Sequence, residues 1–147
     1  MSDAENLLDA IRTLLRAFTV DETRFPPAEG RIKYNPHDFQ SLYFIAGHPG
    51  CRGADLAAFL GVAPTTAQSV IDRLIERRFV LRTENPDSRR AVALHLTDEG
   101  VEVTQAIRRQ DIANCRAMLS ALPKAERKRF AEQMTIIAEA IAAQEIA

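Results

Sequence analysis

The side chains best suited to recognition chemistry lie between positions 64 and 90. The spacing predicts a helix from Pro64 with hydroxyl, amide and basic side chains on its polar side, followed by a hairpin that ends in arginines. Hydroxyls and amides can hydrogen-bond to base edges or to phosphate, whereas arginine suits phosphate and narrow minor grooves. The candidates for such contacts are Thr65, Thr66, Gln68, Ser69 and Arg73 on the helix, and Arg89 and Arg90 at the hairpin.

The charge balance limits this interpretation without excluding it. The chain has 147 residues, 19 basic and 20 acidic, and a net charge of −1, so it is not a globally basic nucleic-acid binder. Residues 62–95 nevertheless hold six arginines and four acids, a local charge of +2. A polar helix face of this kind fits either DNA or a protein partner, and the periodicity does not separate the two.

Apolar spacing predicts the helices that precede and include this face. We expect a helix over 1–20 with a capping box of Ser2 and Glu5, a connecting loop over 21–36, and a helix over 37–47. A short helix over 54–60 should turn Leu56, Phe59 and Leu60 inward and end at Gly61 in the left-handed conformation. The helix from Pro64 to about Arg78 should bury Ala67, Val70, Ile71, Leu74 and Ile75.

The second half of the chain predicts a hairpin and two further helices. Strands over 80–84 and 92–96 flank a turn at 85–88. Thr97 is the expected N-cap of a helix that ends near Leu122 before Pro123. That helix should bury Val101, Ile112, Cys115 and Leu119, and the last helix should align Phe130, Met134, Ile137 and Ile141.

Together these elements predict a mainly α (α+β) fold. Two short helices joined by a glycine-containing turn form a helix-turn-helix, and the hairpin that follows adds a wing. We therefore expect residues 37–96 to form a winged helix-turn-helix, with further helices at 1–20 and 97–147.

Several short motifs between 53 and 100 point to one family. They are Asp55-Leu56-Ala57, Leu60-Gly61-Val62, Asp72-Arg73-Leu74 before Glu76-Arg77, the wing Asn85-Pro86-Asp87-Ser88-Arg89-Arg90, and Leu96-Thr97-Asp98-Glu99-Gly100. In these motifs the chain resembles the MarR (multiple-antibiotic-resistance regulator) family of winged-helix transcription factors. The wing Asp-x-Arg followed by Leu-Thr-x-x-Gly is the most specific part, and the flanking helices also fit the family layout.

The resemblance implies a homodimeric repressor that binds double-stranded DNA. The N- and C-terminal helices would form the dimerisation region and set two recognition helices about one turn of a pseudopalindromic operator apart. Asp87 would brace the wing through Arg89, and Arg89 or Arg90 would enter the minor groove. A small aromatic or anionic effector would release the DNA, with Arg16, Phe18, Phe39 and Tyr43 as its candidate pocket.

The chain departs from its relatives at three positions near the recognition helix. Arg78 stands where many relatives have glycine, so a residue with a side chain would have to adopt positive φ if the turn requires it. Ala63 replaces the usual capping residue and cannot accept a side-chain hydrogen bond. Ser69 stands where a basic residue is common.

Other function classes receive less support from the sequence. Cys51 in a loop beside Arg52 would have a modestly lowered pKa and suggests a redox-sensing regulator as an alternative, whereas Cys115 is expected in the core. No catalytic motif, cofactor loop or metal-ligand spacing is present, so we expect no enzyme, cofactor or metal site. Without a signal peptide or membrane span, the chain is expected in the cytoplasm.

Overall fold

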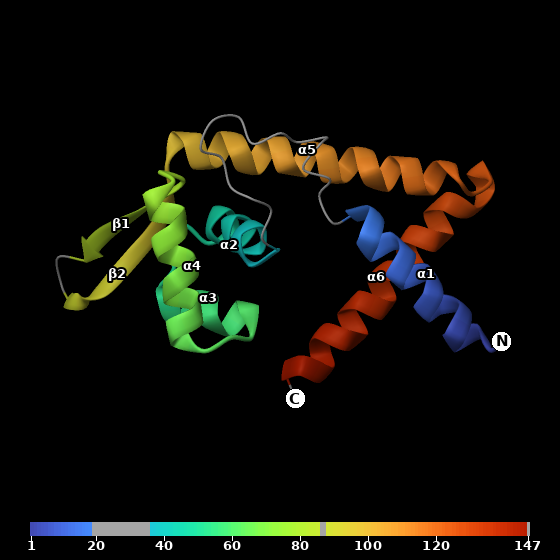
Figure 1. Cartoon of the computed structure of the whole chain (residues 1–147), viewed down its shortest axis with the longest axis horizontal. Coiled ribbons are helices and arrows are strands. Elements are labelled where there is room, and N and C mark those ends of the chain that lie inside the picture. The colour runs from blue at the N-terminus through green and yellow to red at the C-terminus, as the bar shows by residue number, and fades with distance from the viewer. Residues whose placement is uncertain (19–35, 86–87, 147) are drawn as a thin grey trace. The chain divides into compact units, whose positions relative to one another are not determined.

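The computed structural model has six helices and one hairpin in its described part, which comprises residues 1–18, 36–85 and 88–146. The order is α1 (Asp3–Phe18), α2 (Pro36–Gly47), α3 (Gly53–Leu60), α4 (Pro64–Glu76), β1 (Val80–Asn85), β2 (Ser88–Leu96), α5 (Asp98–Ser120) and α6 (Lys124–Ile146) (Figure 1). Side chains at 17–18, 85–91 and 145–146 also lie outside the description. The predicted mainly α fold with a two-stranded wing is confirmed, while the connecting loop over 21–36 lies outside the described residues except for Pro36.

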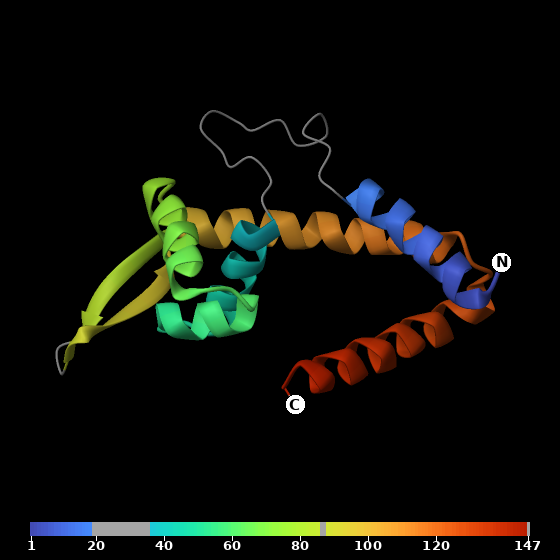
Figure 2. The ribbon, with the colours of Figure 1, turned by 60° about the horizontal axis from the view of Figure 1, so that its bottom comes forward.

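The chain divides into two compact units, Met1–Ile107 and Arg108–Ala147. In the first unit, α2, α3, α4 and both strands surround one apolar core (Figure 2). Its fully buried members come from each of these elements: Leu42, Ile45, Leu56, Val70, Ile71, Leu74, Val80 and Leu94. The predicted apolar face of α4 is therefore confirmed, with Ile75 partly buried at its edge.

One side chain of α3 points the other way from the prediction. Leu56 is fully buried and Leu60 packs against the core, but Phe59 is 53% exposed. Leu56 and Leu60 are four residues apart and occupy the inward face, which places residue 59 toward its edge. The Phe59 ring instead stacks on the outside of Phe44, with ring centroids 4.7 Å apart.

The predicted helix caps are largely confirmed. In α1, Ser2 N–H donates to Glu5 Oε2 (2.7 Å) and Glu5 N–H donates to Ser2 Oγ (3.2 Å), which is a capping box. Hydrogen bonds from the Ser2 backbone and then its side chain lower the pKa of Glu5. Gly61 ends α3 with φ 67°, and Val62 N–H donates to Ala57 O (3.1 Å).

Helix α4 ends at Glu76, two residues before the prediction, in a turn that contains Arg78. Arg78 has φ 64°, a left-handed conformation that glycine adopts more readily than a residue with a side chain. Its N–H donates to Ile75 O (2.9 Å), and Phe79 N–H donates to Leu74 O (3.0 Å), which together form a Schellman motif. Left-handed backbone costs a residue with a Cβ about 1–2 kcal/mol. Arg78 is therefore a position of backbone strain.

The wing is an antiparallel hairpin formed by the two predicted strands. Val80 pairs with Leu96 and Glu84 with Val92, and the register shifts between Glu84 and Asn85. A shift of this kind bends the strand and increases its twist. Turn residues 86–87 lie outside the described part.

Thr97 and Gly100 join the wing to α5 and to the end of α4. Thr97 Oγ1 accepts from Gly100 N–H (3.0 Å), which confirms the predicted N-cap, and donates to Arg78 O (2.5 Å). Thr97 N–H donates to Phe79 O (3.0 Å). A Cβ on Gly100 would lie 2.0 Å from that same Phe79 oxygen. The threonine and the glycine of the Leu-Thr-x-x-Gly motif therefore allow the first turn of α5 to contact the backbone that follows α4.

The prediction of the buried face of α5 is wrong for the single chain, because most of the residues named for it are exposed. Val101 is 41% exposed, Ile112 is 37% exposed and Cys115 is exposed, while Leu119 is partly buried. The face that meets the core is instead made by Gly100, Val103, Thr104 and Ile107. Two of these residues are small or polar, so the apolar pattern did not reveal them. Thr104 is accommodated because its hydroxyl donates to Gly100 O (2.7 Å).

The apolar stripes of α1 and α6 are exposed on their own units. On α1 these side chains are 43–64% exposed: Leu7, Leu8, Ile11 and Leu15. On α6 they are 48–52% exposed: Met134, Ile137 and Ile141. Within the described residues, no helix combines the length and the apolar content that crossing a membrane requires.

Candidate nucleic-acid interface

Helix α4 exposes its polar N-terminal face because its opposite face is locked in the core. Thr65, Thr66, Gln68 and Ser69 are exposed, whereas Ala67, Val70, Ile71 and Leu74 are at most 2% exposed. Figures 1 and 2 show α4 beside the first wing strand. The predicted recognition-helix candidates, Arg73 apart, therefore share one accessible surface.

The N-terminus of α4 has no side-chain cap. Its N-cap is Ala63 in extended conformation with Pro64 in the first turn, which confirms the prediction that residue 63 provides no side-chain hydrogen bond. The first N–H groups of a helix lack carbonyl partners inside the helix, and the helix dipole is positive there. The N–H groups at this end of α4 can therefore donate hydrogen bonds to a phosphate oxygen.

Asp72 organises the polar face through one carboxylate oxygen. Its Oδ1 accepts from Gln68 Nε2 (2.8 Å), one turn earlier on α4, and from Arg82 Nη2 (2.7 Å) on β1. Asp72 is 61% exposed and Arg82 is 40% exposed at the side chain, so this is a surface pair. The contact ties the wing to α4. Neither Asp72 nor Arg82 was among the predicted site residues.

Arg73 forms an ion pair with a buried aspartate on α2. Its Nη2 donates to Asp38 Oδ1 (2.7 Å), and the Asp38 side chain is only 4% exposed. The Arg73 side chain is nevertheless 40% exposed. The pair joins α2 to α4. Asp38 was missed because an acidic residue at the start of a helix also fits an ordinary N-terminal turn.

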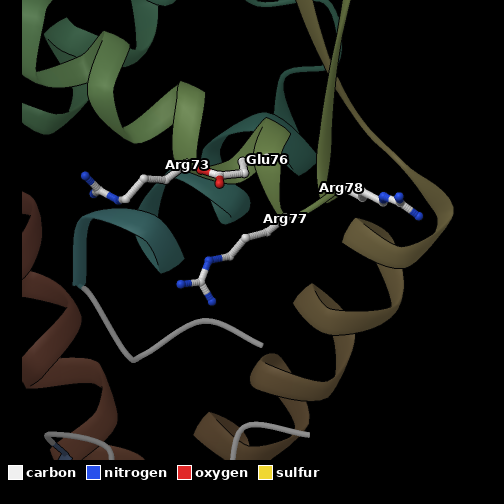
Figure 3. Close-up of a pocket in the computed structure, with 4 residues that line it drawn as sticks. All are labelled: Arg73, Glu76, Arg77 and Arg78. Carbon is white, nitrogen blue, oxygen red and sulfur yellow. The ribbon is translucent and has the colours of Figure 1, made fainter. Parts of the chain in front are cut away.

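A pocket lies at the C-terminal end of α4. It is lined by Arg73, Glu76, Arg77 and Arg78. Figure 3 shows Arg73 and Arg77 directed to one side of the helix end and Arg78 to the other. None of the residues predicted to form an effector pocket lines it. Of those, Phe39 packs against the core, Tyr43 is partly buried, Arg16 is exposed on α1, and the Phe18 side chain lies outside the description.

The wing arginines remain predictions at the level of their side chains. Arg89 and Arg90 belong to β2 by their backbone, but their side chains lie outside the description, as does Asp87. The structure places the strand that carries both arginines beside β1, and Arg82 ties β1 to α4.

The sequence predicted Cys51 in a loop and Cys115 in the core, and the structure shows Cys51 buried and Cys115 exposed. Cys51 is 9% exposed and its carbonyl accepts from Leu94 N–H (2.8 Å), whereas Cys115 is exposed. Burial, and then the negative charge of Asp55, raise the pKa of Cys51, so the lowering expected from Arg52 is wrong. A buried thiol with a raised pKa is a poor redox sensor. Among the described residues, no three His, Cys, Asp or Glu side chains form a metal-binding group.

Comparison with known proteins shows similarity to one family. Residues 33–91 match the model described as the MarR family. The HTH-type transcriptional repressor MdtR of Bacillus subtilis (strain 168) is 27% identical over 101 residues, and the match spans 68% of this chain and 65% of MdtR.

Two solved structures share the fold over almost the whole chain. The crystal structure of MarR is 25% identical, covers 97% of this chain and 99% of its own, and has a TM-score of 0.73. Streptococcus pneumoniae FabT in complex with DNA is 15% identical with coverages of 97% and 99%, and its TM-score of 0.81 shows the shared fold. The winged helix and its wing thus agree with these matches, and the chain is similar to the MarR family over residues 33–91.

Proposed function

We propose that this protein is a DNA-binding transcriptional regulator and that it acts as a repressor. The observation that carries the proposal is the exposed polar face of α4, fixed by a buried apolar face and tied to the wing through Asp72 and Arg82. An α-helix held in this way fits the major groove, with the wing over the adjacent backbone or minor groove. The relative MdtR is described as a repressor, and the FabT structure with the same fold is in complex with DNA.

The functional unit in this proposal is a homodimer. The exposed apolar stripes of α1 and α6 are the surfaces that a second copy would cover, because side chains such as Leu7, Ile11 and Ile137 gain from leaving water. Residues 1–20 and 97–147 would supply the dimerisation region and residues 37–96 the DNA-binding region. Two copies would present two α4 helices to a pseudopalindromic operator.

A small anionic or aromatic effector completes the proposal. The pocket at the end of α4 is lined by three arginines and Glu76, and this local charge of +2 favours an anion. Such a ligand would act on the strained turn at Arg78. A regulator of this kind works in the cytoplasm, and the proposal includes no catalysis.

Removal of the wing arginines tests the DNA-binding surface. In the Arg89→Ala, Arg90→Ala double variant, we expect affinity to fall about tenfold or more, because wing contacts to phosphate and minor groove are lost. The probe is a duplex enriched from random DNA by the wild-type protein, and the readout is a fluorescence-anisotropy titration.

The Arg108→Ala, Arg109→Ala variant is the matched control, because it removes the same charge from exposed positions on α5. Its affinity should stay within about twofold of wild type, because neither arginine belongs to α4 or to the wing. Equal losses in both variants would mean that overall charge, and not the wing, accounts for binding.

A further inference from the structure

One carboxylate on the recognition surface holds two potential DNA ligands at once. Asp72 Oδ1 accepts from Gln68 Nε2 (2.8 Å) and from Arg82 Nη2 (2.7 Å). The Asp72 side chain is 61% exposed, so the pair is not needed to satisfy a buried charge. An exposed ion pair contributes little to stability, typically about 0–1 kcal/mol. Stability therefore does not explain why the Asp72–Arg82 ion pair lies on the proposed DNA-facing surface.

For Arg82, the effect of Asp72 is neutralisation. Arg82 is 40% exposed on β1 and would otherwise be a cation free to bind any phosphate. Phosphate contacts raise affinity for all duplexes without distinguishing sequences. By occupying Arg82, the Asp72 carboxylate lowers affinity for DNA of any sequence.

For Gln68, the effect of Asp72 is orientation. One N–H of the Gln68 amide is directed at the carboxylate, and a carboxylate can only accept, so the amide cannot reverse. The second N–H and the Oε1 of Gln68 stay available on the exposed face. A donor and an acceptor side by side on an amide match N7 and N6 of adenine in the major groove.

We propose that Asp72 is a specificity-determining residue, which holds Gln68 in the orientation that reads one adenine and keeps Arg82 from binding phosphate non-specifically. The inference rests on the proposed function and extends it to the source of sequence discrimination. Asp72 acts through Gln68 and Arg82 and needs no contact with the DNA itself.

The test compares Asp72→Asn with wild type on two duplexes. One duplex is enriched from random DNA by the wild-type protein, and the other has the same composition in shuffled order. The variant should bind the shuffled duplex about fivefold more tightly, with a salt dependence steeper by about one phosphate contact. Discrimination between the duplexes should fall about tenfold, and most of that loss should map to one A·T pair.

Three further variants separate this role from a structural one. Asp72→Glu keeps the acceptor and should retain wild-type discrimination. Asp72→Asn combined with Arg82→Gln should lose the extra affinity for the shuffled duplex. Glu84→Gln removes an exposed carboxylate from the same strand as Arg82 and should leave discrimination unchanged within about twofold, because screened charges act on both duplexes alike.

Two results with Asp72→Asn would overturn the inference alone, and one result with the wild-type protein would overturn the proposed function as well. If Asp72→Asn weakens binding to both duplexes equally, Asp72 only supports the fold of the surface. Unchanged discrimination in Asp72→Asn would show that Gln68 and Arg82 do not depend on it. If the wild-type protein enriches no sequence at all, the proposed function has failed, and this inference falls with it.

Discussion

Gly100→Ala is expected to destabilise the protein by about 3 kcal/mol or more, because the added Cβ meets backbone that cannot move aside. That Cβ would lie 2.0 Å from Phe79 O, which already accepts a hydrogen bond from Thr97 N–H. To make room, the first turn of α5 must leave the end of α4 and break the Thr97 contacts. In a thermal melt, a loss of this size should lower Tm by roughly 6–12 °C.

Arg78→Gly is the matched comparison at the same junction, and its expected effect has the opposite sign. Arg78 carries its side chain at φ 64°, a conformation that glycine adopts without steric cost. The substitution should therefore stabilise the fold by about 1 kcal/mol, less whatever glycine gains in the unfolded chain. Both variants are melted at the same protein concentration, because the stability of an oligomer depends on it. Equal Tm values for Gly100→Ala and wild type would contradict the close approach of Gly100 to the Phe79 backbone.

Ile11→Glu combined with Ile137→Glu is expected to convert a dimer into a monomer. Ile11 is 43% exposed and Ile137 is 48% exposed in the single chain, and each lies in the middle of an apolar stripe. Covering both with a second copy would bury carboxylates without partners, at a cost of several kcal/mol. Light scattering at micromolar concentration should give about twice the 16.4 kDa chain mass for wild type and the chain mass for the variant.

Thr135→Glu is the control for this prediction. It adds a carboxylate to the same helix, but residue 135 lies off the stripe formed by Met134, Ile137 and Ile141. The control should remain a dimer. A wild-type mass of one chain would contradict the dimer, and a dimeric double variant would show that other surfaces form the interface.

Local signals were sufficient to predict most elements of the winged helix. Ser2 with Glu5, Gly61 after α3, Pro64 at the start of α4 and Thr97 before α5 each act through hydrogen bonds or φ preferences within a few residues. The apolar face of α4 was predictable because its spacing matches the helical period. Such features depend on sequence neighbours alone.

Features that depend on distant contacts were not predictable. Asp38 bonds to Arg73 across 35 positions, and Asp72 bonds to Arg82 across ten positions and between two elements. Cys51 is buried because its loop pairs with Leu94, and the inward face of α5 includes Gly100 and Thr104, which carry no apolar signal. In these cases the tertiary partner, and not the residue type, decides the environment.

The most direct test of the proposed function is the affinity of the wild-type 147-residue protein for duplex DNA as salt is varied. The net charge of −1 provides little general attraction to DNA, so binding must come from the α4 and wing surfaces. We expect the duplex enriched from random DNA to bind at least about a thousandfold more tightly than a shuffled duplex, and log K to fall linearly with log salt concentration. Equal binding to both duplexes, or binding to neither, would contradict the proposal and leave a winged helix used for protein contacts.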